Sequence, residues 1–214
     1  MALLAGFPAL AGADLEVSAG EVVLLRGANG AGKSTVLRVC AGLAEVASGE
    51  AVVLGCDLRA DRRAVRRRVG LLGHETFLYD DLSVADNVRF AVRAAAGDVN
   101  AVKPALARLG LDGRLARLDV GRLSAGQRRR VALAVLAARR PQLWLLDEPH
   151  AGLDAEARDL LEGLIAETVG SGATVVMASH EVDRAHALAN RTLTVAGGVI
   201  YAGARPAAEP LHVA

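Results

Sequence analysis

The eight residues from Gly27 to Ser34 read GANGAGKS and are the group in this chain with the clearest chemistry. Glycines at this density let consecutive backbone N–H groups curl around a phosphate, and Lys33 adds a positive charge beside it. The hydroxyl of Ser34 suits Mg²⁺, and a helix that begins here adds the partial positive charge of its N-terminus. The pattern predicts a P-loop, which binds the phosphates of a nucleotide together with Mg²⁺.

Two adjacent acids, Asp147 and Glu148, follow the apolar run Leu143–Leu146. A run of this kind is typical of a central strand that is buried on both faces. Carboxylates at the C-terminal end of such a strand lie where open α/β sheets bind their ligands. We expect Asp147 to hold Mg²⁺ through water and Glu148 to polarise the attacking water. Taken alone, the same residues also fit an ordinary strand end whose acids cap the next turn.

A third motif, Leu123–Gln127, reads LSAGQ and precedes an apolar helix. Ser124 can cap that helix and Gly126 permits a close backbone approach, so the helix start is a second candidate phosphate site. Lys33 already belongs to one such site, and one nucleotide does not need two of them within a single subunit. From the residues alone, a capped helix without a ligand is the simpler interpretation.

These motifs require strands and helices that bring them together. A strand precedes the P-loop, a helix follows it, and strands and helices alternate again from residue 143 to a terminal hairpin. This alternation predicts an α/β fold with a mostly parallel sheet and helices on its faces. The expected strands are 14–17, 22–25, 51–54, 69–73, 143–146, 173–178, 192–195 and 199–202, and the expected helices are 61–68, 84–96, 103–109, 125–138, 155–169 and 181–189.

The whole chain, residues 1–214, is expected to form one domain. The segment 76–138 is mostly helical and interrupts the alternation, which indicates a helical subdomain inserted into a core of about 1–75 and 139–203. The tail 204–214 is rich in Ala and Pro and is expected to fray. Within 61–68 the basic residues are most simply a solvated helix face; they are Arg62, Arg63, Arg66, Arg67 and Arg68.

The composition is that of a folded globular chain. Of its 214 residues, 52% are apolar and 23% are charged, which suffices for a substantial core. The net charge is +1 and aromatic residues make up 3%, so neither a basic surface for nucleic acid nor a base-stacking platform is expected. No apolar stretch approaches the ~20 residues of a membrane-spanning helix. A role at a membrane would therefore need a partner protein.

The motifs Gly27–Ser34, Leu123–Gln127, Leu146–Pro149 and Ala151–Asp154 are followed by His180. In this order they resemble the nucleotide-binding domain of an ABC transporter, in which LSAGQ is the family signature. The resemblance covers roughly residues 10–203. It implies a P-loop NTPase of the ABC ATPase type, with a mostly parallel core sheet, an antiparallel β subdomain and the inserted helical subdomain.

The resemblance also implies a role for each matching residue, with ATP and Mg²⁺ as cofactors. Glu148 is the implied general base, His180 contacts the γ-phosphate, and Asp147 and Ser34 hold the metal. Ser124 and Gly126 contact the ATP of a second copy of the chain, which accounts for the second phosphate site because two ATP molecules are sandwiched head-to-tail. The implied loop between subunits is 151–154. The residues implied in nucleotide binding are Gly27, Ala28, Asn29, Gly30, Ala31, Gly32, Lys33, Ser34, Thr35, Ser124, Gly126 and Phe7.

Two positions depart from the family pattern. His74 stands where most members carry a glutamine that offers a neutral carbonyl to Mg²⁺ and the attacking water. An imidazole can act similarly through a ring nitrogen, but it titrates near neutral pH, which predicts pH-dependent hydrolysis. Phe7 is the one aromatic residue upstream of the P-loop that is available to stack on adenine. Either Phe7 stacks, or the stacking is weak, or the chain begins late.

The pair Gly73-His74, the helix after LSAGQ and the tryptophan in Leu143–Pro149 resemble one branch of the family, the ATPases of cytochrome c maturation haem exporters. This implies a peripheral protein on the cytoplasmic face of the membrane that drives an integral-membrane permease and exports haem or serves a related step. The alternatives are the ATPase of another exporter, or a soluble ABC ATPase acting on nucleic acid or the ribosome. Members of that last class usually carry two cassettes, a coiled-coil insertion or basic extensions, so we expect no nucleic-acid partner.

Overall fold

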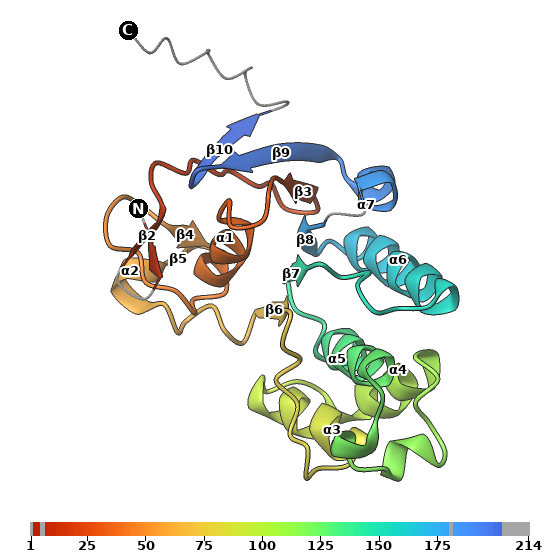
Figure 1. Cartoon of the computed structure of the whole chain (residues 1–214). Helices are drawn as coiled ribbons and strands as arrows, with labels where there is room; N and C mark the ends of the chain where they lie inside the picture. Colours follow the sequence, from red (N-terminus) through yellow and green to blue (C-terminus); the bar gives the residue numbers. More distant parts are fainter. Residues whose placement is uncertain (1, 5–6, 180–181, 203–214) are drawn as a thin grey trace, which may run out of the picture.

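The computed structural model describes residues 2–4, 7–179 and 182–202 (Figure 1), with the side chains of 3–4, 7–9 and 182–183 left out of the description. His180 and the tail 204–214 lie outside the described residues.

A central sheet is built from β3 (Val22–Arg26), β6 (Val69–Leu72), β7 (Leu143–Asp147), β8 (Thr174–Ala178), β9 (Arg191–Ala196) and β10 (Val199–Ala202). Its order is β10-β9-β3-β8-β7-β6, and all neighbours are parallel except β10, which runs antiparallel to β9. Because the parallel strands point the same way, their carboxyl ends meet at one edge of the sheet, where α/β folds bind ligands. The predicted α/β class with a mostly parallel sheet is confirmed.

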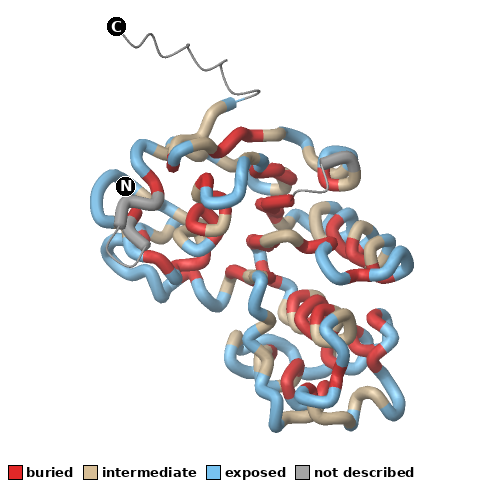
Figure 2. The backbone as a smooth tube through the Cα atoms, viewed as in Figure 1, coloured by how far each residue is buried: buried red, intermediate tan, exposed pale blue. Residues whose placement is uncertain are grey.

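Both faces of this sheet are covered by helices (Figure 1). On one face Val23 and Leu25 of β3 belong to the same buried cluster as α1 (Lys33–Cys40). On the other face Leu24 clusters with α5 (Ala125–Arg139) and α6 (Ala155–Gly170). Successive strand residues point to opposite faces, so a strand covered on both sides is apolar throughout. All of Leu143–Leu146 is buried, as predicted for a central strand, and Figure 2 shows the buried residues concentrated between the sheet and its helices.

The helices α3 (Val84–Ala94), α4 (Val102–Arg108) and α5 pack against one another beyond the β6 edge of the sheet (Figure 1). Ser83 caps α3 as expected, since its hydroxyl accepts a hydrogen bond from the N–H of Asp86. Three short 3₁₀ turns complete this region: η1 (Val99–Ala101), η2 (Leu115–Arg117) and η3 (Val120–Arg122). The last helix, α7 (Val182–Leu188), leads into β9.

Two short antiparallel pairs lie outside the central sheet. One consists of β1 (Ala2–Leu4) and β2 (Phe7–Leu10), and the other of β4 (Val52–Val53) and β5 (Cys56–Asp57). The strand expected at 51–54 is therefore reduced to two residues. The strand expected at 14–17 is wrong: these residues are irregular, because no described strand pairs with them.

The helix expected at 61–68 is also wrong. The helix α2 (Leu58–Asp61) ends where the arginine-rich segment begins, and 62–68 form turns. Like charges four residues apart disfavour a helix here, at Arg62 with Arg66. Some of these arginines also bind backbone carbonyls: Arg66 donates to Gly42 and Arg68 to Leu54. The segment is therefore more than a solvated face.

Candidate functional site

The P-loop connects β3 to α1. Gly27, Gly30 and Gly32 have φ angles of +152°, +77° and +111°, a region that residues with a Cβ rarely adopt. Lys33 is buried, and its ammonium donates to the carbonyl oxygens of Gly27 at 2.8 Å and Ala28 at 3.1 Å. The Lys33 ammonium is thus held by carbonyl oxygens of its own loop. Phosphate oxygens can replace these acceptors when a nucleotide binds.

The hairpin of β9 and β10 packs against the P-loop, and its turn lines the cavity at Gly197 and Gly198. A Cβ added to Gly27 would lie 2.1 Å from the carbonyl oxygen of Val195, so this approach requires glycine. The N–H of Gly198 donates to the carbonyl of Ala31 at 3.1 Å. A Gly-Gly pair between two strands signals a hairpin turn. Sequence reasoning found this hairpin but missed its contact with the site, because nothing local indicates what a turn packs against.

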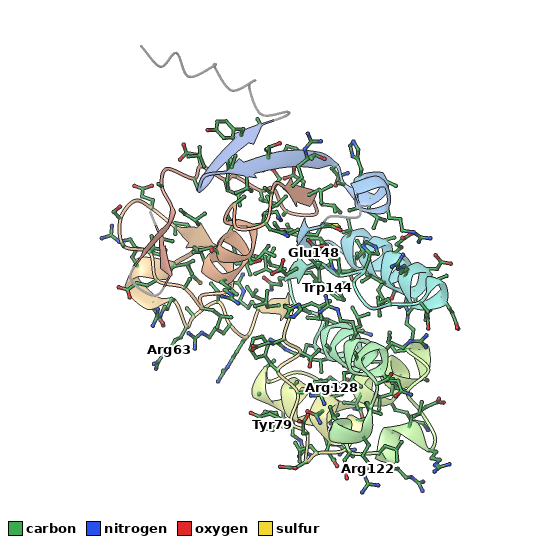
Figure 3. All side chains as sticks on the ribbon, in the orientation of Figure 1. Arg63, Tyr79, Arg122, Arg128, Trp144 and Glu148 are labelled. Atoms are coloured by element: carbon green, nitrogen blue, oxygen red, sulfur yellow. The ribbon has the colours of Figure 1, made fainter. Side chains whose placement is uncertain are left out.

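The acids Asp147 and Glu148 lie where β7 ends. The N–H of Glu148 donates to the carbonyl of Ala178, the last residue of β8, at 2.8 Å. Glu148 has a φ of +47°, which is uncommon for a residue with a side chain. Such strain persists only where neighbouring contacts impose it, and it gathers at functional sites. Figure 3 labels Glu148, directly after β7, and Trp144 of that strand near the middle of the molecule.

A cavity of about 660 Å³ brings the predicted residues together at the carboxyl edge of the sheet. This volume falls within the range of small-molecule sites, roughly 300–1,000 Å³. Five segments that are separate in the sequence contribute: Ala11 after β2, the P-loop with the start of α1, the loop after β6, the end of β7 and the turn between β9 and β10. The predicted site residues that line it are Asn29, Gly30, Gly32, Lys33, Ser34, Thr35, His74, Asp147 and Glu148.

Gly27, Ala28 and Ala31 belong to the P-loop but do not line the cavity themselves. Ser124 and Gly126 do not line it either. The hydroxyl of Ser124 accepts a hydrogen bond from the N–H of Gln127 at 3.2 Å, and the Gln127 side chain accepts one from the N–H of Ser124 at 3.0 Å. This capping box stabilises the start of α5. A Cβ on Gly126 would lie 3.2 Å from the carbonyl of Gly152, so this glycine makes a close approach within its own chain. Within one copy, therefore, the LSAGQ segment stands apart from the P-loop.

The oxygen donors on the cavity suit Mg²⁺. Ser34 supplies a hydroxyl and Asp147 a carboxylate, which are the hard ligands this cation prefers. In the part of the chain that the structure describes, no group of three or more His, Cys, Asp or Glu side chains gathers to hold a metal. Magnesium commonly binds through one or two protein oxygens together with substrate phosphates. The donor set therefore fits a magnesium ion that binds together with a nucleotide.

The loop that leads from β7 into α6 is fixed by Asp154. Its carboxylate caps α6 by accepting from the N–H of Ala157 at 2.8 Å, and it pairs with Arg130 of α5 at 2.8 Å. The hydrogen bond from Ala157 is the main cause that lowers the pKa of Asp154, and Arg130 acts in the same direction. The loop 151–154 is thereby tied to the helix that carries LSAGQ.

Sequence reasoning missed Arg129, which lies in the second turn of α5. It is buried, and its guanidinium donates to three backbone carbonyls, those of Gly73, Asp147 and Glu148. Burial lowers the pKa of Arg129, while the charges of Asp147 and Glu148 raise it. The spacing of its neighbours could have revealed this burial. The residues three, four and seven positions after Arg129 are all apolar, which places Arg129 on the buried face of the helix.

Two further predicted residues cannot be compared with the cavity. Phe7 belongs to β2, but its side chain lies outside the described part, as does the whole of His180.

The family model for ABC transporters matches residues 10–151. The chain belongs to the ABC transporter family. It is similar to the cytochrome c biogenesis ATP-binding export protein CcmA of Vibrio cholerae, with 39% identity over 78% of this chain and 82% of the relative. The corresponding protein CcmA 2 of Cupriavidus metallidurans is 41% identical, over 79% of this chain and 81% of the relative.

Solved structures agree with this family assignment. The dimeric ATP-binding cassette MJ0796 bound to ADP and Pi has a TM-score of 0.82 and 25% identity, covering 90% of this chain and 88% of that one. This ABC chain is therefore an ATP-binding, ATP-hydrolysing subunit of the transporter type. Among the described residues, no helix is long and apolar enough to span a membrane.

Proposed function

We propose that this ABC ATPase works as a head-to-tail dimer at the cytoplasmic face of the membrane, where it drives a permease that exports haem or serves a related step of cytochrome c biogenesis. The observation that carries the proposal is the separation of the motifs. The P-loop, Asp147 and Glu148 line one cavity, whereas Ser124 and Gly126 lie outside it. A second copy of the chain would supply these residues to the open side of the cavity, and the dimeric MJ0796 structure supports this arrangement.

In this dimer Lys33 and the P-loop backbone bind the phosphates, and Ser34 and Asp147 are the residues that would hold Mg²⁺. The metal, when bound, neutralises charge on the phosphates. Glu148 accepts a proton from the attacking water and orients it in line with the γ-phosphate. His180 is assigned to the γ-phosphate by family resemblance alone. Catalysis then consists mainly of positioning and charge stabilisation.

The cytochrome c assignment is tested in cells. A strain that lacks this chain should lose its c-type cytochromes, measured by staining covalently bound haem after denaturing electrophoresis. The wild-type chain should restore them and the Glu148→Gln variant should not. Normal cytochrome c levels in the deletion strain would contradict the haem assignment and favour an exporter of another substrate.

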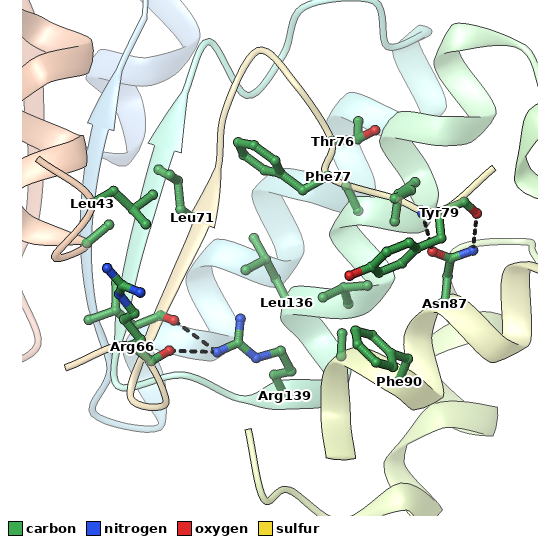
Figure 4. Close-up of a pocket in the computed structure, with 16 residues that line it drawn as sticks. Leu43, Arg66, Leu71, Thr76, Phe77, Tyr79, Asn87, Phe90, Leu136 and Arg139 are labelled. Atoms are coloured by element: carbon green, nitrogen blue, oxygen red, sulfur yellow. Dashed lines mark hydrogen bonds between the residues drawn. The ribbon is translucent and has the colours of Figure 1, made fainter. Parts of the chain in front are cut away.

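A groove between β6 and the helices α3 and α5 is the proposed contact with the permease (Figure 4). Its most exposed apolar residues are Phe77, 66% exposed, and Tyr79, 53% exposed. The Tyr79 ring packs edge-on against Phe90 at 5.1 Å, and the buried Asn87 fixes the Tyr79 backbone through its N–H at 2.8 Å and its carbonyl at 2.9 Å. A rigid, exposed apolar patch of this kind is typical of a protein interface.

Two arginines border the same groove. The guanidinium of Arg139 donates to the carbonyls of Arg66 and Val69 at 3.1 Å each, and the Arg66 side chain is exposed beside it (Figure 4). The groove therefore combines apolar surface with positive charge. It suits a helix of the permease that presents apolar residues and an acidic side chain.

We expect the double variant Phe77→Ser and Tyr79→Ser to lose most of its binding to the permease while it still binds ATP. Each substitution removes about 1–3 kcal/mol of apolar burial on docking, so the affinity of the double variant should fall by roughly 30-fold or more. Co-purification with detergent-solubilised membrane proteins measures the loss. Val99→Ser, which removes an exposed apolar residue outside the groove, is the matched control and should bind normally. Unchanged co-purification of the double variant would rule out this groove.

The exposed His74 on the nucleotide cavity is proposed to replace the family glutamine. A ring nitrogen of His74 would accept a hydrogen bond from the attacking water, as the carbonyl of the family glutamine does. His74→Gln should therefore keep most of the wild-type kcat, whereas His74→Ala should lose much of it. Steady-state rates of ATP hydrolysis measure the difference, and a His74→Ala chain with the wild-type kcat would contradict the role of His74.

A further inference from the structure

The guanidinium of Arg129 joins three parts of the molecule that are separate in the sequence. It belongs to α5, two residues after the LSAGQ segment. One terminal nitrogen donates to the carbonyl of Gly73, directly before His74. The other donates to the carbonyls of Asp147 at 2.9 Å and Glu148 at 2.7 Å.

The contact with Glu148 falls on a strained peptide. The φ of +47° at Glu148 requires support from its neighbours. Its N–H is held by the carbonyl of Ala178 at 2.8 Å. Its carbonyl accepts from Arg129 and also from the N–H of Ala151 at 3.1 Å. The backbone that carries the Glu148 carboxylate is thus held on both sides, and Arg129 contributes a side chain to this support.

We propose that Arg129 is a positioning residue for ATP hydrolysis, which sets the backbone of Glu148 and of the loop before His74 relative to the LSAGQ helix. Arg129 does not line the cavity that holds the P-loop, but it lines an adjoining cavity together with His74, Asp147 and Glu148. Its proposed action is through the backbone groups that it binds. This inference rests on the proposed role of Glu148 as the base. The Arg129 contact is the one through which the LSAGQ helix would hold the backbone of Glu148 in place.

The planar fork of arginine is what the site requires. Its two terminal nitrogens serve opposite loops, and a lysine ammonium is a single point that cannot occupy both positions. Arg129→Lys keeps the positive charge but should release one of the two loops. A misplacement of about 1 Å at a catalytic group can cost roughly 100-fold in rate.

Arg68 provides a matched control at the opposite ends of β6 and β7. It directly precedes β6, donates to the carbonyl of Leu54 at 2.9 Å, and contacts Gln142, the residue before β7, at 2.8 Å. Arg68 therefore joins the amino ends of β6 and β7, as Arg129 joins their carboxyl ends. Arg68→Lys removes the same fork at the end of the sheet remote from the nucleotide.

The experiment compares wild type, Arg129→Lys and Arg68→Lys as full-length chains. For Arg129→Lys we expect kcat to fall by about 10- to 100-fold with the Kd for ATP unchanged within about twofold. Hydrogen–deuterium exchange should increase in 147–153, because the N–H of Ala151 binds the carbonyl that Arg129 holds. Arg68→Lys should leave kcat, Kd and exchange in 147–153 at wild-type values.

Several results would overturn the inference. One is unchanged exchange in 147–153, and another is a loss of kcat no larger than that of Arg68→Lys. A parallel loss of kcat and ATP affinity would show a general structural effect. Arg129→Gln is the second variant, and if neither variant folds while Arg68→Lys does, Arg129 has a structural role only. Glu148→Gln, measured in parallel, separates the two proposals. Full ATPase activity of this variant would rule out Glu148 as the general base, independently of the result for Arg129→Lys.

Discussion

Replacing Glu148 by glutamine should lower kcat for ATP hydrolysis by about 100- to 10,000-fold, the contribution of a positioned general base. The amide is nearly the same size as the carboxylate, so the contacts that hold the Glu148 backbone should persist. Glutamine, however, has no basic group to take a proton from water. ATP should then bind without being cleaved, and the dimer that it closes should accumulate.

Size-exclusion chromatography with ATP measures this accumulation, and phosphate release measures the rate. Glu148→Gln should elute as a dimer with ATP and as a monomer with ADP. Glu156→Gln removes an exposed carboxylate from the first turn of α6, close in the sequence but outside the cavity, and should hydrolyse ATP normally. A Glu148→Gln chain that remains monomeric with ATP and still hydrolyses it quickly would contradict two proposals: that Glu148 is the general base, and that hydrolysis requires the dimer.

Replacing Lys33 by alanine should weaken ATP binding by about 10- to 100-fold, the equivalent of ~1.5–3 kcal/mol for hydrogen bonds to a charged group. In the wild-type chain the ammonium is already desolvated against the carbonyls of Gly27 and Ala28, so little reorganisation opposes its contact with phosphate. Alanine leaves those carbonyls and the glycine geometry of the loop in place. The loss should therefore concern the nucleotide and not the fold.

Lys33 and Lys103 are the two lysines of this chain, which makes the second a natural control. Lys103 is exposed on α4, away from the cavity. Titration with a fluorescent ATP analogue should give a wild-type Kd for Lys103→Ala and a much larger Kd for Lys33→Ala, with similar melting temperatures for both. Equal nucleotide affinities in the two variants would show that Lys33 does not bind the phosphates.

The predictions that depended on hydrophobic pattern and local capping were accurate. The apolar run before Asp147 became β7, and Ser83 and Ser124 became caps of α3 and α5. Such signals are local, because an apolar strand or a capping serine needs only its own neighbours in the sequence. The arginine-rich segment 61–68 failed for the opposite reason. Its conformation depends on carbonyl acceptors at Gly42 and Leu54, which no local pattern specifies.

The family, the α/β class and the groups expected to bind phosphate and magnesium follow from residue types at fixed spacing along the chain. Which of those groups share a cavity depends on the tertiary structure. The fold keeps Ser124 away from the P-loop, packs Val195 of β9 against Gly27, and directs Arg129 to the backbone of Glu148. Each of these contacts joins segments far apart in the chain. Strand order and helix packing create them, and neither is encoded in any short stretch of residues.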